Sequence, residues 1–125
     1  MVIKSEKAEK MVSEKPRGGK GIIINNRYLD SHELDNNLQG FYVNELESSG
    51  EIGYHMHEGE EEIYYVLEGN GIILDNGKEV PIEKGDVIYT KSGESHGMIN
   101  TGKEPLKFIG FIVKKSFLPN KLYLK

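Results

Sequence analysis

Short apolar runs separated by glycine recur along this chain, and this pattern constrains its fold more than any other feature. The 125 residues include 15 glycines, most of which stand between runs rich in Val, Ile, Tyr and Phe. Runs of this kind, bounded by glycine and other turn residues, are typical of β-strands. We therefore predict an all-β chain, with strands at 20–25, 40–46, 51–57, 62–68, 71–75, 78–83, 86–90, 95–100 and 106–113.

The triplet Asp75-Asn76-Gly77 is the strongest turn signal in the chain. A two-residue hairpin turn needs positive φ at its central residues, and Asn and Gly adopt positive φ more readily than other residues do. We predict that this triplet joins the strands 71–75 and 78–83 into an antiparallel hairpin.

Chain length and strand number together predict one closed β domain. A chain of 125 residues with 37% hydrophobic content can form one core but is short for two domains. Many short strands leave exposed edges unless they close into a barrel or pack as two sheets. We predict a small antiparallel β-barrel at 20–113, a charged N-terminal tail at 1–19, and a C-terminal tail at 114–125 that packs on the barrel or on a partner.

The stretch 5–14 within the N-terminal tail is rich in Lys and Glu. A run of charges is more often solvated chain than a regular element, so we read it as solvated, with one or two helical turns as the alternative. We assign it no function.

Composition excludes several classes of function. The net charge of −4 and the pI near 5.6 argue against nucleic-acid binding, which needs clustered positive charge. No stretch approaches the roughly 20 apolar residues of a membrane span, and no secretory signal is recognisable, so we expect no membrane partner and a cytoplasmic location. The chain has no cysteine, so a metal site must use nitrogen and oxygen ligands.

Two of the four histidines stand one residue apart, at His55 and His57. Alternate residues of a strand share a face, so both imidazoles can converge on one ion. A bend containing Gly59 would return Glu62 beside them, and closure of a barrel would bring His96 to the same interior. The alternative is that both histidines are exposed and that the acidic residues at 58 and 60–62 form a solvated turn.

These residues lie within two longer motifs that resemble those of the cupin superfamily. The first motif, G-x5-H-x-H-x(3,4)-E-x6-G, runs through His55, His57, Glu62 and Gly69; the second, G-x5-P-x-G-x2-H-x3-N, runs through Gly85, Gly93, His96 and Asn100. Two positions depart from the family pattern: Gly50 stands one residue too close to His55, and Lys91 replaces the proline. Neither departure removes a ligand, although loss of the proline should loosen the turn before His96.

The resemblance, which covers residues 38–113, implies a cupin-like jelly roll, or double-stranded β-helix. It also implies that His55, His57, Glu62 and His96 are metal ligands, the same four residues that the spacing proposes. Such a set suits Mn²⁺, Fe²⁺, Ni²⁺, Co²⁺ or Zn²⁺, and the sequence does not choose among them. Four protein ligands on an octahedral ion leave two positions for water or a substrate.

Strand alternation places further side chains near the predicted metal. Tyr64 and Val66 share a face with Glu62, and Met98 and Asn100 share one with His96. Tyr64 and Asn100 are our candidates for orienting a substrate, while Val66 and Met98 are read as core. Two further residues lie outside the site: His32 is read as a surface residue, and Glu60 is read as part of a solvated turn that can also act as a second layer around the metal.

We predict a metal-dependent enzyme acting on a small oxygen-bearing metabolite, with a non-catalytic binding or sensing module as the alternative. Cupins as a family include dioxygenases, isomerases and decarboxylases. We predict no organic cofactor, because GGKG at 18–21 lacks the residues of a phosphate-binding loop. The outward positions Ile63, Tyr65 and Leu67 are apolar, so we also predict a homodimer.

Overall fold

The computed structural model describes residues 1–34 and 37–114, which form ten β-strands and three short 3₁₀ turns. The strands are β1 (Glu9–Glu14), β2 (Ile22–Asp30), β3 (Leu38–Leu46), β4 (Glu51–Met56), β5 (Glu60–Glu68), β6 (Asn70–Asp75), β7 (Lys78–Glu83), β8 (Val87–Thr90), β9 (Ser95–Ile99) and β10 (Leu106–Lys114). The 3₁₀ turns are η1 (Ser5–Lys7), η2 (Pro16–Gly18) and η3 (Ser31–Glu33).

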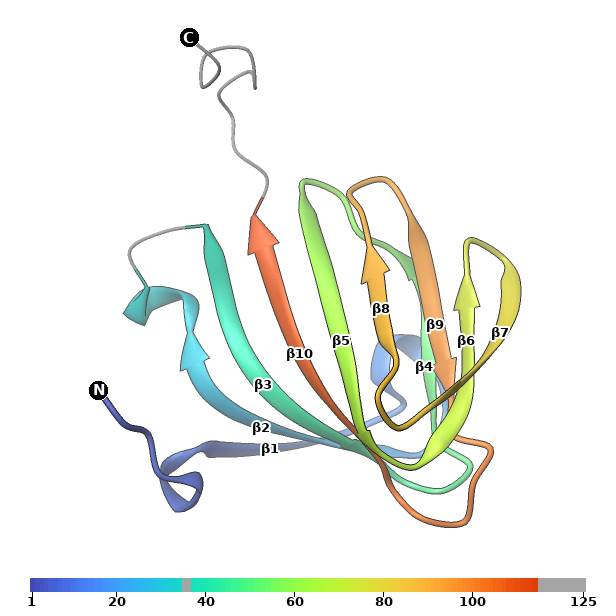
Figure 1. The fold of residues 1–125 in the computed structure, drawn as a ribbon, viewed down its shortest axis with the longest axis horizontal. Coiled ribbons are helices and arrows are strands. Elements are labelled where there is room, and N and C mark those ends of the chain that lie inside the picture. The colour runs from blue at the N-terminus through green and yellow to red at the C-terminus, as the bar shows by residue number, and fades with distance from the viewer. Residues whose placement is uncertain (35–36, 115–125) are drawn as a thin grey trace, which may run out of the picture.

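The strands form two antiparallel sheets that face each other across a common interior (Figure 1). One sheet has the order β1-β2-β3-β10-β5-β8, and the other has the order β4-β9-β6-β7. Strands distant in the sequence are neighbours in both sheets, since β10 lies between β3 and β5 and β9 pairs with β4. The predicted all-β jelly roll is confirmed.

The core lies between the sheets and takes alternate residues from strands of both, such as β5, β6 and β8. Leu46, Val66, Leu106 and Phe108 are all fully buried. Along β5, Glu62, Tyr64 and Val66 point inward and are buried, whereas Tyr65 is exposed. This alternation carries the carboxylate of Glu62 into the barrel interior.

The predicted hairpin at Asp75-Asn76-Gly77 is confirmed. Asp75 pairs with Lys78, and the two residues between them have φ of 49° at Asn76 and 84° at Gly77. Both angles lie in the left-handed region that this hairpin turn requires.

The N-terminal segment differs from its prediction. Residues Glu9–Glu14 form β1, which pairs with β2 along its whole length at the edge of the larger sheet. All six side chains of β1 are exposed, so the strand is held by main-chain hydrogen bonds and leaves no burial pattern in the sequence. The reading of 5–14 as solvated tail was therefore wrong for β1.

The other predicted strands are present, β7 with the predicted bounds and the rest with one or both ends shifted. The largest shift is in β2, whose polar half continues to Asp30 because it pairs with β3. Lys114 ends β10, and the rest of the predicted C-terminal tail, 115–125, lies outside the described residues. In the described part of the chain, no helix has the length and apolar character needed to cross a membrane.

Candidate metal centre

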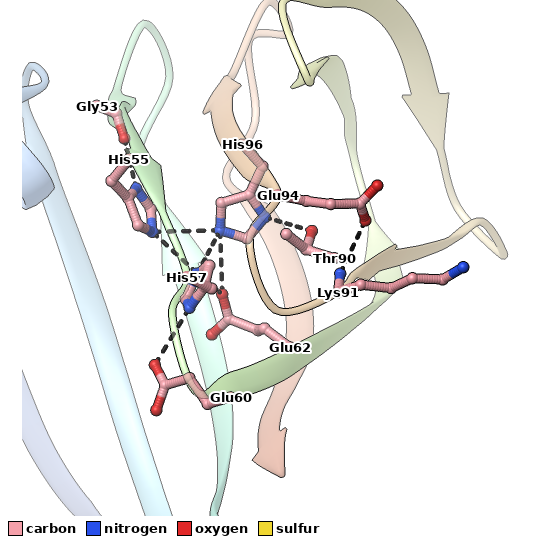
Figure 2. Close-up of polar contacts among 9 residues, drawn as sticks. All are labelled: Gly53, His55, His57, Glu60, Glu62, Thr90, Lys91, Glu94 and His96. Carbon is pink, nitrogen blue, oxygen red and sulfur yellow. Dashed lines mark hydrogen bonds and ion pairs between the residues drawn. The ribbon is translucent and has the colours of Figure 1, made fainter. Parts of the chain in front are cut away.

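Four side chains from three strand regions meet inside the barrel (Figure 2). His55 lies on β4, His57 directly follows it, Glu62 lies on β5, and His96 lies on β9 opposite His55. One ligand atom from each lies within 4.8 Å of the others. The four residues that the motifs predicted are therefore brought together.

A β-bulge in β4 aims the first two histidines inward. The pairing of β4 with β9 shifts between Ile52 and His55. Ile52 is buried before the bulge, yet Tyr54 and Met56 after it are largely exposed. The inward-facing positions therefore change from even-numbered to odd-numbered residues within the bulge. A bulge of this kind re-aims side chains at functional sites.

The four ligand atoms form a compact group. The Nε2 atom of His57 lies 3.1 Å from that of His55 and 2.9 Å from that of His96, and the His55 to His96 distance is 3.2 Å. Glu62 Oε1 lies 3.0 Å from His57 Nε2 and 3.1 Å from His96 Nε2. His57 and His96 are almost fully buried, and Glu62 is only 8% exposed.

The opposite nitrogen of each ring is held by a second layer of groups. His55 Nδ1 lies 2.7 Å from the Gly53 carbonyl oxygen, and His57 Nδ1 lies 3.2 Å from Glu60 Oε1. Carbonyl and carboxylate oxygens only accept hydrogen bonds, so these two Nδ1 atoms are the donors. In the neutral rings, the Nε2 lone pairs of His55 and His57 then face the cluster.

His96 is oriented by a hydroxyl. Its Nδ1 atom lies 2.8 Å from the buried Oγ1 of Thr90, which stands directly across from Glu62 on β8. Thr90 thereby fixes the plane of the third imidazole ring.

Glu62 Oε1 shows why this arrangement fits a cation. It is buried and lacks a hydrogen-bond partner among the described residues, although two imidazole nitrogens lie about 3 Å away. Facing lone pairs and a carboxylate cannot satisfy one another in a buried site, whereas a divalent cation accepts electron pairs from all of them. The donor set is therefore that of a nitrogen- and oxygen-ligated metal site.

The electrostatics of the cluster keep the carboxylate ionised. Burial raises the pKa of Glu62, but the hydrogen bonds and positive charge that His57 and His96 supply when Nε2 carries a proton outweigh it and lower that pKa to about 2. The contact with Glu62 raises the pKa of His57, while burial lowers the pKa of His55. A proton on His57 competes for the same lone pair that a cation would use.

A cavity of about 200 Å³ adjoins His55, His57 and Glu62. Its polar lining comes from Arg17, Asn25, Tyr42, Asn44 and Tyr64, and its apolar lining comes from Pro16, Ile23, Ile52, Phe108 and Ile112. A larger hollow of about 350 Å³ around Ile73, Pro81 and Val87 has no histidine in its lining, so we place the site at the cavity beside the cluster.

The two predicted orienting residues lie in different surroundings. Tyr64 is buried, and its ring stacks on His96 with centroids 5.2 Å apart. Asn100 donates from Nδ2 to the carbonyl oxygens of Leu46 and Glu104, and its Oδ1 accepts from Gly102 N–H. Asn100 therefore holds the loop after β9 through its amide, whereas Tyr64 lines the cavity.

The remaining predicted positions are as follows. Val66 and Met98 belong to the core, and the side chain of His32 is 77% exposed near Asp30. Lys91, at the motif's proline position, donates its main-chain N–H to Glu94 Oε1 at 2.9 Å, a bond that proline could not make.

Sequence reasoning missed the groups that support the cluster from other strands. Thr90 had no motif of its own, and the strand register that sets it opposite Glu62 was unknown. Arg17 lies in the segment read as tail, and Asn25 and Asn44 lie on strands outside both motifs. Asn25 and Asn44 lie opposite each other where β2 pairs with β3, and only this pairing shows that they belong to one site.

Comparison with known proteins agrees with this geometry. A family model described as Cupin domain matches residues 42–112. A protein of Thermotoga maritima named oxalate-binding protein is 42% identical over 113 residues, covering 90% of this chain and 93% of that protein.

Two solved structures illustrate the similarity of fold. The crystal structure of a predicted oxalate decarboxylase from Thermotoga maritima superposes with a TM-score of 0.87 at 41% identity, covering 91% of this chain and 99% of that one. The polyketide cyclase RemF from Streptomyces resistomycificus shares the fold, with a TM-score of 0.74 at 22% identity over 98% of this chain and 89% of that one. With the domain match, the full-length relative and the jelly roll in agreement, the chain belongs to the cupin superfamily.

Proposed function

We propose that this cupin binds a divalent transition-metal ion through His55, His57, Glu62 and His96, and that the adjoining cavity takes up a small carboxylate, with oxalate as the first candidate. The observation that carries the proposal is the inward-facing donor set, in which Glu62 Oε1 is buried without a hydrogen-bond partner in the described part of the chain.

Nitrogen and oxygen ligands suit Mn²⁺, Fe²⁺, Co²⁺, Ni²⁺ and Zn²⁺. Such an ion, when bound, supplies a Lewis-acidic centre with coordination positions beyond its four protein ligands. The protein's part is to hold three neutral imidazoles and one ionised carboxylate in place, through Gly53, Glu60 and Thr90.

The choice of ligand rests on the cavity and on the relatives. The cavity is small, with a guanidinium and two amides in its lining, which suits a compact anion. The Thermotoga relative carries the name oxalate-binding protein, and the similar crystal structure is described as a predicted oxalate decarboxylase. Oxalate is compact enough for the small cavity, and it is an anion that the guanidinium and the amides can bind.

Binding without turnover is favoured over catalysis by the chemistry of the lining. Among the described residues that line the cavity, the only carboxylate is Glu62, which belongs to the metal cluster. Glu60 is engaged by His57 Nδ1. Decarboxylation replaces a carbon–carbon bond with a carbon–hydrogen bond and therefore needs a proton donor. Burial raises the pKa of the Tyr64 hydroxyl, which makes it a weak acid.

Decarboxylation is the second candidate, and the description of the similar Thermotoga structure favours it. In that case Tyr64, which lines the cavity beside His96, is the residue positioned to orient the substrate. Nothing in the lining favours the dioxygenase or isomerase alternatives over these two.

Replacing His57 with Ala tests the metal ligands. Loss of a group that only orients a ligand already costs about 10- to 100-fold in metal affinity, so loss of a ligand should cost more than about 100-fold. His32→Ala is the matched control, because that side chain is exposed outside the cluster. Elemental analysis after reconstitution should find metal in the wild type and in the control but little in His57→Ala. Equal metal in all three proteins would refute the assignment.

Metal affinity should fall as the pH is lowered. Glu62 stays ionised because its pKa is about 2, so the imidazoles decide the response. The raised pKa of His57 places proton competition at and above the ordinary histidine range near about 6.5, whereas the lowered pKa of His55 moves its competition to lower pH. Competition titrations with a chelator of known pH dependence between about pH 5 and 8 measure this. An affinity unchanged across that interval would contradict three-imidazole ligation.

Oxalate should bind saturably to the metal-loaded protein and not to the metal-free protein. Calorimetry with the Mn²⁺, Fe²⁺, Co²⁺, Ni²⁺ and Zn²⁺ forms measures this, with metal content checked afterwards because oxalate itself chelates metals. His57→Ala serves as the control for binding elsewhere. Absence of an isotherm with every metal form would overturn the ligand assignment. Release of formate and carbon dioxide, abolished in His57→Ala, would establish the decarboxylase.

We also propose a homodimer. The outer face of β5 and β8 exposes Tyr65, Val87 and Tyr89, and Tyr65 lies opposite Val87 in the sheet. Contiguous exposed apolar side chains of this kind are typical of protein interfaces. The outer face of the larger sheet is therefore the surface that a second copy would cover.

Light scattering should return twice the 14.1 kDa chain mass for the wild type. Tyr65→Glu should dissociate the dimer, because it places an unpaired charge at the interface. Tyr54→Glu, at an exposed tyrosine on β4 of the smaller sheet, is the control and should remain dimeric. A wild-type mass of one chain would refute the dimer.

Cytoplasmic location stays a prediction, which cell fractionation would test.

A further inference from the structure

The cavity has a second wall that the metal cluster does not use. It is built from Arg17 in η2, Asn25 on β2 and Asn44 on β3, and these side chains line the same cavity as His55, His57 and Glu62. Arg17 supplies a guanidinium and the asparagines supply amides. The wall is therefore rich in hydrogen-bond donors.

Arg17 is held at the cavity by main-chain contacts. Its turn is closed by hydrogen bonds from Gly18 N–H to the Lys15 carbonyl oxygen and from Gly19 N–H to that of Pro16, both 2.9 Å long. A Cβ atom on Gly53 would overlap the Arg17 carbonyl oxygen. The backbone of the turn thus packs directly against β4, two residues before His55.

The φ of Arg17 is 53°, in the left-handed region that residues other than glycine seldom adopt. Strained backbone of this kind persists where surrounding contacts fix it, and it clusters at ligand-binding sites. The contacts with β4 provide that fixation.

The charge of Arg17 is not neutralised by an ion pair within the ranges 1–34 and 37–114. Its side chain lines the same cavity as His55, His57 and Glu62. The guanidinium is thus available to a ligand in the cavity.

Asn44 provides a second donor in the same wall of the cavity. The residue is 6% exposed, and its Oδ1 accepts from Asn25 Nδ2 at 2.6 Å. Its own Nδ2 lies against Gly110, at 3.1 Å from the position that a Cβ atom would take on that glycine. This Nδ2 has no acceptor among the described residues. Asn44 Nδ2 is not among the buried polar atoms without a partner, so it is accessible from the cavity that the residue lines and is free to donate to a ligand there.

We propose that Arg17 and Asn44 bind the carboxylate oxygens of a dicarboxylate that face away from the metal cluster. This inference rests on the proposed function and extends it to a ligand class, the small dianion. Among the groups that line the cavity, the carboxylate of Glu62 offsets one of the two charges of a divalent ion, and Arg17 adds one positive charge to the remainder. A dicarboxylate balances that total, and a monocarboxylate leaves one positive charge unmatched.

Calorimetry with oxalate and with formate on the Mn²⁺-loaded protein separates this role from metal binding. In Arg17→Gln, oxalate affinity should fall by about 10- to 100-fold, because a charge-assisted hydrogen-bonded pair is lost. Formate affinity should change by less than about twofold, and metal content should be unchanged. Arg17→Lys should recover only part of the loss, because lysine keeps the charge but not the planar fork.

Lys10→Gln is the matched control, because it removes one positive charge from the exposed edge strand β1. It should bind oxalate as the wild type does. Asn44→Ala should weaken oxalate by about three- to tenfold, as expected for an uncharged hydrogen bond, with circular dichroism confirming the fold.

Wild-type oxalate affinity in Arg17→Gln would overturn this inference alone. Loss of metal from that variant, or an equal loss of formate affinity, would also overturn it, because Arg17 would then act on the metal site or on charge in general. Failure of the wild type to bind oxalate would overturn the proposed function itself.

Discussion

Three imidazole nitrogens and one carboxylate oxygen converge inside the barrel, and the rest of the structure is arranged around that convergence. Groups of this kind are costly to bury without a partner, and Glu62 Oε1 has no hydrogen-bond partner in the described part of the protein. The ligands come from both sheets, with His55 and His96 on the smaller sheet and Glu62 on the larger one. A cation at this point would therefore join the two halves of the jelly roll.

The fold prepares this point through local devices that have separate physical causes. The bulge in β4 changes which alternate residues face the interior, so that His55 points inward. The following turn at Gly59, with φ of 78°, leads the chain into the opposite sheet. Gly53, Glu60 and Thr90 then fix the three rings through their outer nitrogens. The N-terminal turn lines the cavity and brings a positive charge to it, and among the described lining residues the only carboxylate is that of Glu62. The proposed preference for small dianions follows from that balance of charge.

The barrel and the four ligands could be predicted because each leaves a local pattern. Strand periodicity places His55 and His57 on one face, and the spacing of the two motifs adds Glu62 and His96. The strand β1 could not be predicted, because its side chains are all exposed and its pairing uses only the main chain. Thr90 and Asn44 depend on which strands become neighbours, which the sequence does not encode locally. Asn100 matches the motif, yet its amide holds the loop after β9. A match to a motif therefore indicates that a residue is important, but it does not indicate which groups that residue contacts.

The central claim is that the four convergent side chains form a metal site. The most direct measurement is a crystal structure of protein purified without chelators, with anomalous differences collected at the absorption edge of the metal found by elemental analysis. The account predicts one anomalous peak at about 2.0 to 2.2 Å from the Nε2 atoms of His55, His57 and His96 and from Glu62 Oε1. An anomalous peak elsewhere, or none at a cluster whose four side chains still converge, would contradict it.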